Sequence, residues 1–278
     1  MEEEILRTEG LSFFYEEGIP ALNQISVAIH KHEKIAVLGA NGAGKSTFFL
    51  NLNGVREPAS GAVYLHGEKI GKKTRNELRK SVGIVFQDAD SQIIASTVKA
   101  EIAFGPLNLK LPREEVESRT ERAIEQMKLQ TMAGRPPHYL SGGEKKRVTI
   151  ADILAMESEI IIFDEPTASL DPVNAEMLEN ILGELKREGK TILLSTHDVD
   201  FAYRFADRIL VFWEGRLLAD GNATEIFQNA ELLRKTNLVK PVLLQVFEML
   251  EREGLTGAAK EYPRTLMDIE KILKERKR

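Results

Sequence analysis

The segment GANGAGKST, from Gly39 to Thr47, has residue types and spacing that could bind phosphate groups. Its glycines allow successive backbone N–H groups to converge on phosphate oxygens without side-chain clashes. The segment follows the apolar run KIAVL and precedes FFLNLN, so a strand should enter the loop and a helix should leave it. The N-terminus of that helix adds a partial positive charge at the same point. The pattern Gly39-x4-Gly44-Lys45-Ser46 is therefore interpreted as a Walker A loop that binds a nucleotide.

Nucleotide binding gives the residues of this loop specific roles. Lys45 should reach the β- and γ-phosphates, and the hydroxyl of Ser46 should ligate Mg²⁺. An ordinary glycine-rich turn is the alternative, and the strand before the loop and the helix after it argue against that alternative. The residues expected to contact the nucleotide are Gly39, Ala40, Asn41, Gly42, Ala43, Gly44, Lys45, Ser46 and Thr47.

Two adjacent acids follow another apolar run, in the segment EIIIFDEPTASLD. Four apolar residues ending in Asp164 and Glu165 describe a buried strand that carries both acids to the carboxyl edge of an α/β sheet, where such sheets bind ligands. Asp164 is predicted to hold Mg²⁺ through water, and Glu165 to polarise an attacking water as a general base. The pair alone could simply end a strand, but downstream of a Walker A loop that alternative is much weaker.

A third motif lies in the segment YLSGGEKKRVTIADILAM. Ser141, Gly142 and Gly143 come immediately before an amphipathic helix that has Val148 and Ala151 on one side. The N-terminus of this helix could bind a second anion. One nucleotide has one γ-phosphate, which the Walker A loop already holds, so two anion-binding ends suggest a head-to-tail dimer with each nucleotide between two chains. Taken alone, a Ser-Gly-Gly start is more often a plain helix cap.

The elements that must position these motifs can be predicted from hydrophobic periodicity. Alternation of apolar and polar residues predicts half-buried strands at Ile5–Tyr15 and Ile25–Ile29. The segment EEGIP between them contains the turn residues Gly18 and Pro20. The wholly apolar run Ile35–Leu38 predicts a strand covered on both faces. Further strands are predicted at Ala62–Leu65, Val82–Phe86, Ile160–Phe163, Thr191–Ser195 and Ile209–Trp213, the last turning at Glu214-Gly215 into Arg216–Ala219.

Helix-forming residues dominate two further regions. Residues from about Asp88 to Ser158 are rich in them and are interpreted as an inserted helical subdomain. After about Asn222 the chain is predicted to be helical to its end, and Thr265 with Asp268 resembles a capping box.

Composition limits the class of protein. The 278 residues are 42% hydrophobic and 29% charged, ordinary values for a large soluble globular domain. The net charge of −5 argues against the broad basic surface of a nucleic-acid-binding protein. The absence of cysteine excludes disulfides, thiol catalysis and zinc–thiolate sites. His30 and His32 form an HxH pair that could suggest a metal site, but beside a lysine at a strand end the sequence favours solvated surface.

Nothing in the sequence predicts that this chain crosses a membrane. No apolar run approaches the roughly 18 residues that a spanning helix needs. The acidic N-terminal segment MEEEILRTEG lacks the profile of a signal peptide. If the protein works at a membrane, another chain is expected to supply the spanning part.

The segment LSGGE, together with the Walker A loop and DEPTASLD, resembles the ATP-binding subunit of an ABC transporter, over about residues 4–221. By position, the resemblance implies that Tyr15 stacks on adenine, and that Gln87 contacts Mg²⁺ and senses the γ-phosphate. It also implies that Asp171 belongs to the D-loop and that His197 is the switch histidine that touches the γ-phosphate. The residues expected to close over the ATP of the opposite subunit are Ser141, Gly142 and Gly143. The expected catalytic residues are Lys45, Gln87, Glu165 and His197, and the expected metal ligands are Ser46, Gln87 and Asp164.

A narrower resemblance lies in VFQDADSQIIASTVKAEIAFGPLNLKLPREEV, which is similar to the cobalt-type, energy-coupling factor branch of this family. That branch takes up cobalt, nickel or vitamins with a transmembrane coupling protein and a substrate-binding membrane protein. An added C-terminal helical segment supports dimerisation there, which implies the same for the tail of this chain. Ala89 and Glu101 depart from the proline and aspartate common in the branch, and they bear on which partner docks there. Ala40 replaces a common proline of the loop, where backbone matters more than side chain.

These observations predict an α/β protein with a P-loop NTPase core that has a mixed sheet, an antiparallel β subdomain and an inserted α-helical subdomain. The ATPase domain is expected at residues 4–221, with the helical insertion at about 88–158, followed by a C-terminal helical extension at 222–278. We expect an ATPase that uses ATP and Mg²⁺ to power uptake of cobalt, nickel or a vitamin. It should form a homodimer, or a heterodimer with a sister ATPase, peripheral to the cytoplasmic face of the cell membrane, with no nucleic acid partner.

Two alternatives carry the same motifs. A soluble ABC ATPase acting on nucleic acid or the ribosome usually has two cassettes in one chain or a long coiled-coil insertion, and this sequence has neither. A regulatory cassette that binds ATP without hydrolysing it is disfavoured because Lys45, Glu165 and His197 are all present.

Overall fold

A computed structural model of the chain describes residues 3–16, 18–168, 170–256 and 262–276. In this part of the chain the strands form two sheets, one of four strands in the order β2-β1-β4-β5 and one of six in the order β10-β9-β3-β8-β7-β6. The strands are β1 (Glu4–Glu16), β2 (Ile19–His30), β3 (Lys34–Leu38), β4 (Ser60–Leu65), β5 (Glu68–Lys69), β6 (Val82–Val85), β7 (Ile160–Phe163), β8 (Thr191–Ser195), β9 (Arg208–Trp213) and β10 (Arg216–Asn222).

The six-stranded sheet is mixed, as predicted. Its strands pair in parallel from β6 to β9, and β10 pairs with β9 antiparallel. All five residues of β3 are buried. Because side chains alternate along a strand, Ile35 and Val37 join the core shared with the antiparallel sheet, and Ala36 and Leu38 join the core on the opposite face. The strand before the Walker A loop is therefore held from both sides.

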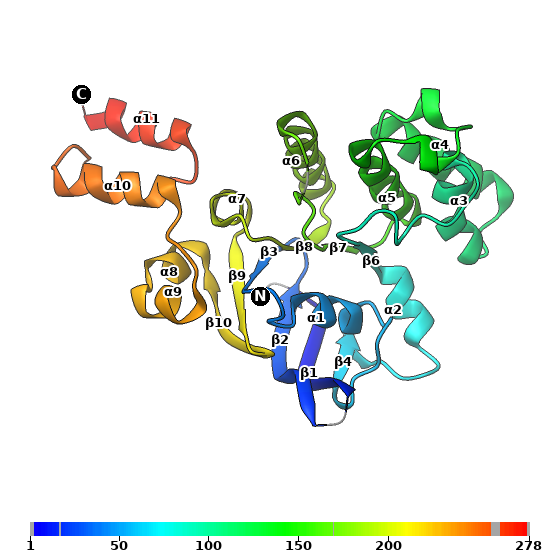
Figure 1. Cartoon of the computed structure of the whole chain (residues 1–278), viewed down its shortest axis with the longest axis horizontal. Coiled ribbons are helices and arrows are strands. Elements are labelled where there is room, and N and C mark those ends of the chain that lie inside the picture. The colour runs from blue at the N-terminus through cyan, green and yellow to red at the C-terminus, as the bar shows by residue number, and fades with distance from the viewer. Residues whose placement is uncertain (1–2, 17, 169, 257–261, 277–278) are drawn as a thin grey trace.

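Helices cover the core that contains Ala36 and Leu38, on the face of the six-stranded sheet opposite the antiparallel sheet, and extend beyond it (Figure 1). α3, α4 and α5 pack on one another at one end of the molecule, and α10 and α11 lie at the other end, with the sheets between them (Figure 1). None of the helices in the described residues combines the length and apolar character needed to span a membrane. The helices are α1 (Lys45–Leu52), α2 (Arg75–Ser81), α3 (Val98–Asn108), α4 (Arg113–Gln126), α5 (Gly142–Met156), α6 (Pro172–Arg187), α7 (Val199–Phe205), α8 (Ala223–Gln228), α9 (Ala230–Thr236), α10 (Val242–Arg252) and α11 (Leu266–Arg276), with 3₁₀ turns at Gln130–Met132 and Pro137–Tyr139.

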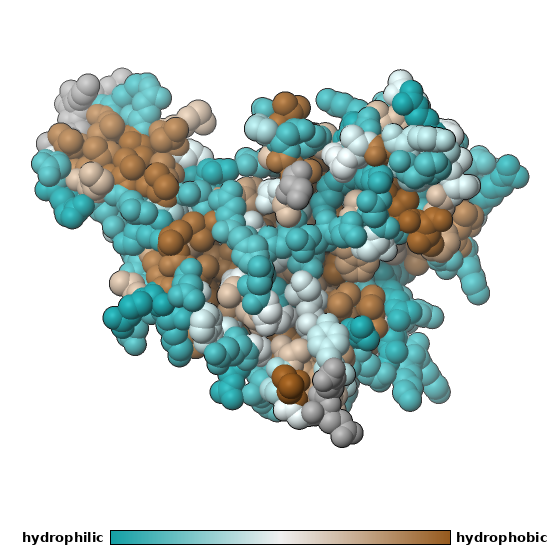
Figure 2. Space-filling view, viewed as in Figure 1, coloured by the Kyte–Doolittle hydropathy of each residue, from teal (hydrophilic) through white to brown (hydrophobic). Residues whose placement is uncertain are grey.

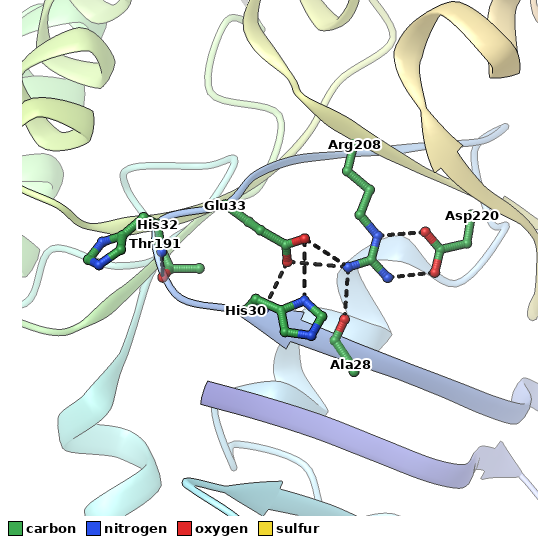
Figure 3. Close-up of polar contacts among 7 residues, drawn as sticks. All are labelled: Ala28, His30, His32, Glu33, Thr191, Arg208 and Asp220. Carbon is green, nitrogen blue, oxygen red and sulfur yellow. Dashed lines mark hydrogen bonds and ion pairs between the residues drawn. The ribbon is translucent and has the colours of Figure 1, made fainter. Parts of the chain in front are cut away.

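A half-buried arginine ties the two sheets together (Figure 3). Arg208 on β9 donates to both carboxylate oxygens of Asp220 on β10, each at 2.6 Å. Its Nη1 also donates to the carbonyl of Ala28 on β2 at 2.9 Å and to Glu33 Oε1 at 3.0 Å. Paired guanidinium–carboxylate bonds of this kind are among the stronger polar contacts in proteins.

The HxH pair near this arginine does not converge on one point (Figure 3). His30 Nδ1 lies 3.5 Å from Glu33 Oε1, whereas His32 Nδ1 lies 2.5 Å from the carbonyl of Gly189. His32 is exposed, as expected for solvated surface, but His30 is half-buried against the network of Arg208.

The turn predicted between the first two strands is shorter in the structure than the sequence indicated. Pro20 was expected in the turn before the second strand, but it lies within β2 and pairs with Phe14 of β1. Proline is tolerated there because β2 is an edge strand of its sheet, where one side of the backbone has no ladder to complete.

Candidate functional site

The Walker A loop connects β3 to α1, and its backbone requires glycine at several positions. Gly39, Gly42 and Gly44 have φ values of 150°, 78° and 104°, which side chains rarely tolerate. A Cβ at Gly39 would also lie 2.4 Å from the carbonyl oxygen of Phe212, and one at Gly44 would lie 2.7 Å from that of Ala21. The loop packs so closely against β2 and β9 that neither Gly39 nor Gly44 could carry a side chain there. Glycine at these positions lets the backbone N–H groups of the loop approach a ligand.

A pocket of about 430 Å³ opens over this loop. Besides loop residues 40–47, it is lined by Tyr15, Gln87 and Glu165, which the sequence predicted, and by three residues at the start of β2. Gly39 does not line the pocket, but its carbonyl accepts a 2.7 Å hydrogen bond from Lys45 Nζ. Residues from four distant segments therefore meet at one cavity, which lies at the carboxyl ends of β3 and β7.

Tyr15 is held in place although its ring is exposed. The residue is 58% exposed, and its ring meets that of Phe13 edge-on with the ring centroids 5.1 Å apart. The hydroxyl lies 3.1 Å from Thr47 Oγ1, and the guanidinium carbon of Arg56 lies 5.5 Å from the ring centroid. An exposed aromatic fixed at the mouth of the pocket is suited to stack on a planar base.

The carboxylate of Glu165 is the chemical centre of the pocket. Its Oε1 lies 3.0 Å from His197 Nε2 and 3.7 Å from Lys45 Nζ. Neither contact has hydrogen-bond geometry, so this buried oxygen has no hydrogen-bond donor among the described residues. The backbone of Glu165 is left-handed, with φ 45°, which is uncommon outside glycine and occurs often at functional sites.

Burial changes the proton affinity of both charged groups in the pocket. Burial raises the pKa of Glu165, and the nearby His197 and Lys45 partly oppose that rise. Burial likewise lowers the pKa of Lys45, against the opposing effect of Glu165 and Asp164. A carboxylate with a raised pKa is a better proton acceptor than an exposed one, which suits a general base.

Ser195 is a residue of the site that was not predicted from the sequence. It ends β8, beside β7, and its Oγ donates to Asp164 Oδ1 at 2.6 Å. The same oxygen accepts the N–H of Glu165 at 2.8 Å. One buried hydroxyl thus fixes both acids, and the signal that could have revealed it is a hydroxyl residue ending the apolar strand TILLS.

Of the three residues proposed to hold Mg²⁺, two line the pocket and the third is buried beside it. Ser46 and Gln87 line the pocket, and Asp164 is buried directly before Glu165. Hydroxyl, amide and carboxylate oxygens are the ligands that Mg²⁺ prefers. The residues present therefore fit a magnesium ion at this pocket.

The Ser141–Gly143 motif lies outside the pocket. Ser141 caps α5 with a reciprocal pair of bonds: its Oγ accepts the N–H of Glu144 at 3.3 Å, and its own N–H donates to Glu144 Oε2 at 2.7 Å. Because Oγ acts there as an acceptor, its proton can still be donated to a ligand. A Cβ on Gly143 would lie 2.6 Å from Nδ2 of Asn174, so the first turns of α5 and α6 touch.

Asp171 also lies outside the pocket and acts as the N-cap of α6. Its carboxylate accepts the backbone N–H and the side-chain amide of Asn174, both at 2.8 Å. These hydrogen bonds lower the pKa of Asp171. Within one chain, then, the predicted residues form two groups: one around the Walker A loop and one at the N-termini of α5 and α6.

Comparisons with known proteins agree with these motifs. The ABC transporter family profile matches residues 22–168. The energy-coupling factor transporter ATP-binding protein EcfA of Methanocaldococcus jannaschii is 46% identical over 251 residues, which are 90% of this chain and 90% of that protein. An ABC transporter ATP-binding protein of Methanosarcina mazei is 44% identical over 97% of this chain, which spans 60% of that longer protein.

A solved structure shares the fold. cbiO1 of Clostridium perfringens, described as part of the ABC transporter complex cbiONQ, superposes with a TM-score of 0.74 at 40% identity. The match covers 90% of this chain and all of that one, and it confirms the predicted P-loop NTPase fold. Because the family profile covers more than half of the chain and close relatives align along nearly all of it, the chain belongs to the ABC transporter family, as one of its ATP-binding subunits and an ATPase.

Proposed function

We propose that the chain is the ATP-hydrolysing subunit of an energy-coupling factor importer, working at the cytoplasmic face of the cell membrane. Its partners would be a transmembrane coupling protein and a membrane protein that binds the substrate, which is cobalt, nickel or a vitamin. The observation that carries the proposal is the buried Glu165 carboxylate beside Lys45 in the Walker A pocket. The names of the similar proteins support the choice of transporter branch.

In the proposed reaction, the pocket orients ATP and a water molecule. Tyr15 stacks on adenine, and the loop N–H groups with Lys45 hold the phosphates. The Oε1 of Glu165 orients the attacking water and accepts its proton, and His197, whose Nε2 lies 3.0 Å from that oxygen, touches the γ-phosphate. Mg²⁺ held by Ser46, Gln87 and, through water, Asp164 would neutralise charge on the β- and γ-phosphates.

Two chains are needed to complete each site. The N-terminus of α5 and the proton of Ser141 lie outside the pocket of their own chain. A head-to-tail dimer would place Ser141, Gly142 and Gly143 over the phosphates held by Lys45 of the opposite chain. Both groups of residues are present in this chain, so a homodimer is feasible, and pairing with a sister ATPase is equally compatible with them.

The C-terminal extension, residues 222–278, offers a second dimer contact. Its last two helices carry a large hydrophobic patch, at the upper left of Figure 2. A soluble protein rarely leaves such a patch exposed unless a partner covers it. The exposed apolar side chains are Val242, Val246 and Met249 on α10, and Leu266 and Met267 on α11.

Contact with the membrane partner is proposed on the surface between Gln87, which lines the Walker A pocket, and Phe104. Ile94 and Phe104, which follow Gln87 along the chain, are large apolar residues with exposed side chains. A helix of the coupling protein docked on this surface would be displaced when ATP closes the dimer. ATP can shift the transporter only by as much as it prefers the closed state over the open one.

The central test is Glu165→Gln, which keeps the shape of the side chain and removes the base. We expect ATP affinity to be retained, the dimer to stay closed on ATP, and turnover to fall by about 100-fold or more. Steady-state ATPase rates and nucleotide titration measure the two effects. Glu159→Gln, an exposed glutamate paired with His66, is the control and should leave both unchanged. Brisk turnover in Glu165→Gln would refute the general-base role.

A separate experiment tests the transport role. Affinity purification of the full chain from membranes should recover hydrophobic membrane subunits. Their identity would narrow the choice among cobalt, nickel and vitamins as the substrate. ATPase activity stimulated by nucleic acid, without such subunits, would instead support the soluble alternative.

A further inference from the structure

Lys146 is a buried lysine that has no role in the reaction proposed above. It lies on α5, one turn after the Ser141–Gly143 motif, and is only 5% exposed. Lysine is almost never fully buried without a partner, and here the partners are two backbone carbonyls. Nζ donates to the carbonyl of Phe86 at 2.7 Å and to that of Gln87 at 3.2 Å.

The two carbonyls belong to the point where the chain leaves the central sheet. β6 ends at Val85, whose carbonyl accepts the N–H of Asp164 on the neighbouring strand. The next two residues are the ones that Lys146 holds. Gln87, which lines the Walker A pocket, thus has its backbone carbonyl bonded to Lys146 of α5, two residues after β6 has ended.

Other contacts fasten the rest of this loop to the same helical group. The side chain of Gln92 accepts the N–H of Phe86 at 3.1 Å and donates to the carbonyl of Thr149 on α5 at 3.4 Å. Further along, Glu101 of α3 accepts the N–H of Ile94 at 2.9 Å. The loop therefore follows α5 and α3 if these helices move relative to the sheet.

Electrostatics favours a cation at this position although burial opposes it. Burial lowers the pKa of Lys146 to about 8, while Asp164 and Asp88 act in the opposite direction. Asp164 directly follows β7, and Asp88 belongs to the loop itself. A neutral side chain of equal length would leave two carbonyls without donors beside these acids.

We propose that Lys146 is a positioning residue: by holding the Phe86 and Gln87 carbonyls on α5, it sets the Gln87 side chain in the Walker A pocket and ties its position to that of the Ser141–Gly143 motif. The inference rests on the proposed function, since Gln87 matters there as a group near Mg²⁺ and the γ-phosphate. Movement of the motif toward or away from an opposite chain would then be felt at Gln87 of its own chain.

The test compares substitutions at two adjacent lysines in the full chain. Lys146→Met removes the donors and keeps the length of the side chain, so the KM for ATP should change less than twofold and kcat should fall about 10- to 100-fold, the usual effect of a displacement of about 1 Å near a reacting group. Lys146→Gln retains one donor group, so its kcat should lie between that of the unaltered chain and that of Lys146→Met. Lys145→Met is the matched control, because Lys145 only pairs with the exposed Asp90, at 2.6 Å, and its loss should change kcat less than twofold.

A double substitution shows whether Lys146 acts through Gln87. If it does, Lys146→Met combined with Gln87→Ala should be no slower than Gln87→Ala alone, because the two residues act as a unit. If the two losses multiply, or if Lys146→Met lowers thermal stability while kcat stays within twofold of the unaltered chain, Lys146 is only a structural residue and the inference is wrong.

Amide hydrogen exchange gives a readout that does not depend on ATPase activity. Exchange in residues 86–88 should increase at least tenfold in Lys146→Met, whereas in Lys145→Met, which loses the contact to Asp90, any increase should be confined to residues 89 and 90. An unaltered chain without ATPase activity would overturn the proposed function, whereas equal exchange in the two variants would overturn the role of Lys146.

Discussion

At the scale of single residues, Ser195 shows how the acids of the site are oriented. Its hydroxyl is buried between Asp164 and Glu165, donating to the first and accepting from the second. A carboxylate that is fixed before the reaction loses less freedom in the transition state than a mobile one. The left-handed backbone of Glu165 is held by the same contact, since its N–H is the donor.

Replacing Ser195 with Ala should therefore affect both stability and catalysis. The N–H of Glu165 would lose its acceptor in a buried position, which costs about 1 to 3 kcal/mol of unfolding free energy. We also expect kcat to fall and more Mg²⁺ to be needed for half-maximal activity, because Asp164 is no longer held. Denaturant unfolding and Mg²⁺ titration of the ATPase rate measure these effects.

Ser158→Ala is the control for this prediction. Ser158 is also a buried serine, but its hydroxyl donates to the carbonyl of Lys80, away from the pocket. It should lower stability by about 1 kcal/mol and leave the Mg²⁺ requirement unchanged. Equal Mg²⁺ requirements in the two variants would contradict the role assigned to Ser195.

The contrast between Ser195 and Glu165 explains what could be predicted at this scale. Glu165 belongs to a contiguous motif in which residue type and spacing indicate the chemistry. Ser195 lies about thirty residues away from the acids that it holds, and its contact depends on β8 being the neighbour of β7. The order of strands in a parallel sheet is a tertiary property, so the sequence motifs alone could not reveal it.

At the scale of elements, the two sheets are joined by a polar connection as well as by their shared core. Arg208 bonds β2, the turn after it and β10 from one position on β9 (Figure 3). The Walker A loop lies between the same sheets, wedged against β2 and β9. A weaker connection would loosen the support of the loop.

Arg208→Met should lower the free energy of unfolding by about 2 to 3 kcal/mol, because Glu33 and Asp220 would lose a half-buried partner. Chemical denaturation monitored by circular dichroism measures the change. Arg204→Met is the matched control, since Arg204 makes a single exposed ion pair with Glu179 and should cost at most about 1 kcal/mol. Similar losses for both arginines would refute the special role of Arg208.

The elements themselves were largely predictable, with informative exceptions. Strands with strong periodicity or continuous apolar runs were found at or near their predicted residues, and the Thr265–Asp268 capping box is confirmed by reciprocal bonds of 2.8 and 3.2 Å. α2, α6 and α7 were not predicted; α2 and α7 are only seven residues long, and so short a helix contains barely two turns of pattern. Pro20 can lie within β2 because β2 is an edge strand, and the order of strands in a sheet cannot be predicted from the local sequence.

At the scale of the whole molecule, the two ends carry different exposed apolar surfaces. Phe104 belongs to α3 and Ile94 is hydrogen-bonded to Glu101 of α3, and α3, α4 and α5 form one end of the molecule, whereas α10 and α11 with their patch lie at the other (Figures 1 and 2). We assigned the first surface to a membrane partner and the second to another ATPase chain. These assignments predict that damage to the second surface impairs assembly without changing the nucleotide pocket.

Val246→Glu combined with Met249→Glu should weaken dimerisation in the absence of nucleotide. Burying these side chains contributes about 1.5 to 3 kcal/mol each, so the dimer dissociation constant should rise at least about tenfold. Sedimentation equilibrium measures it. Gln245→Glu with Arg252→Gln, at polar positions of α10, changes the net charge by the same −2 and should have little effect. An unchanged dissociation constant in the first variant would show that the patch is not a dimer contact.

The separation of these ends also bears on how such a subunit can diversify after gene duplication. On the proposed assignments, residues of α3 to α5 could change to suit a new membrane protein while those of α10 and α11 kept their contact with the sister chain, because the sheets lie between the two ends (Figure 1). A paralogue could thus exchange its cargo system and still share ATPase subunits with the parent.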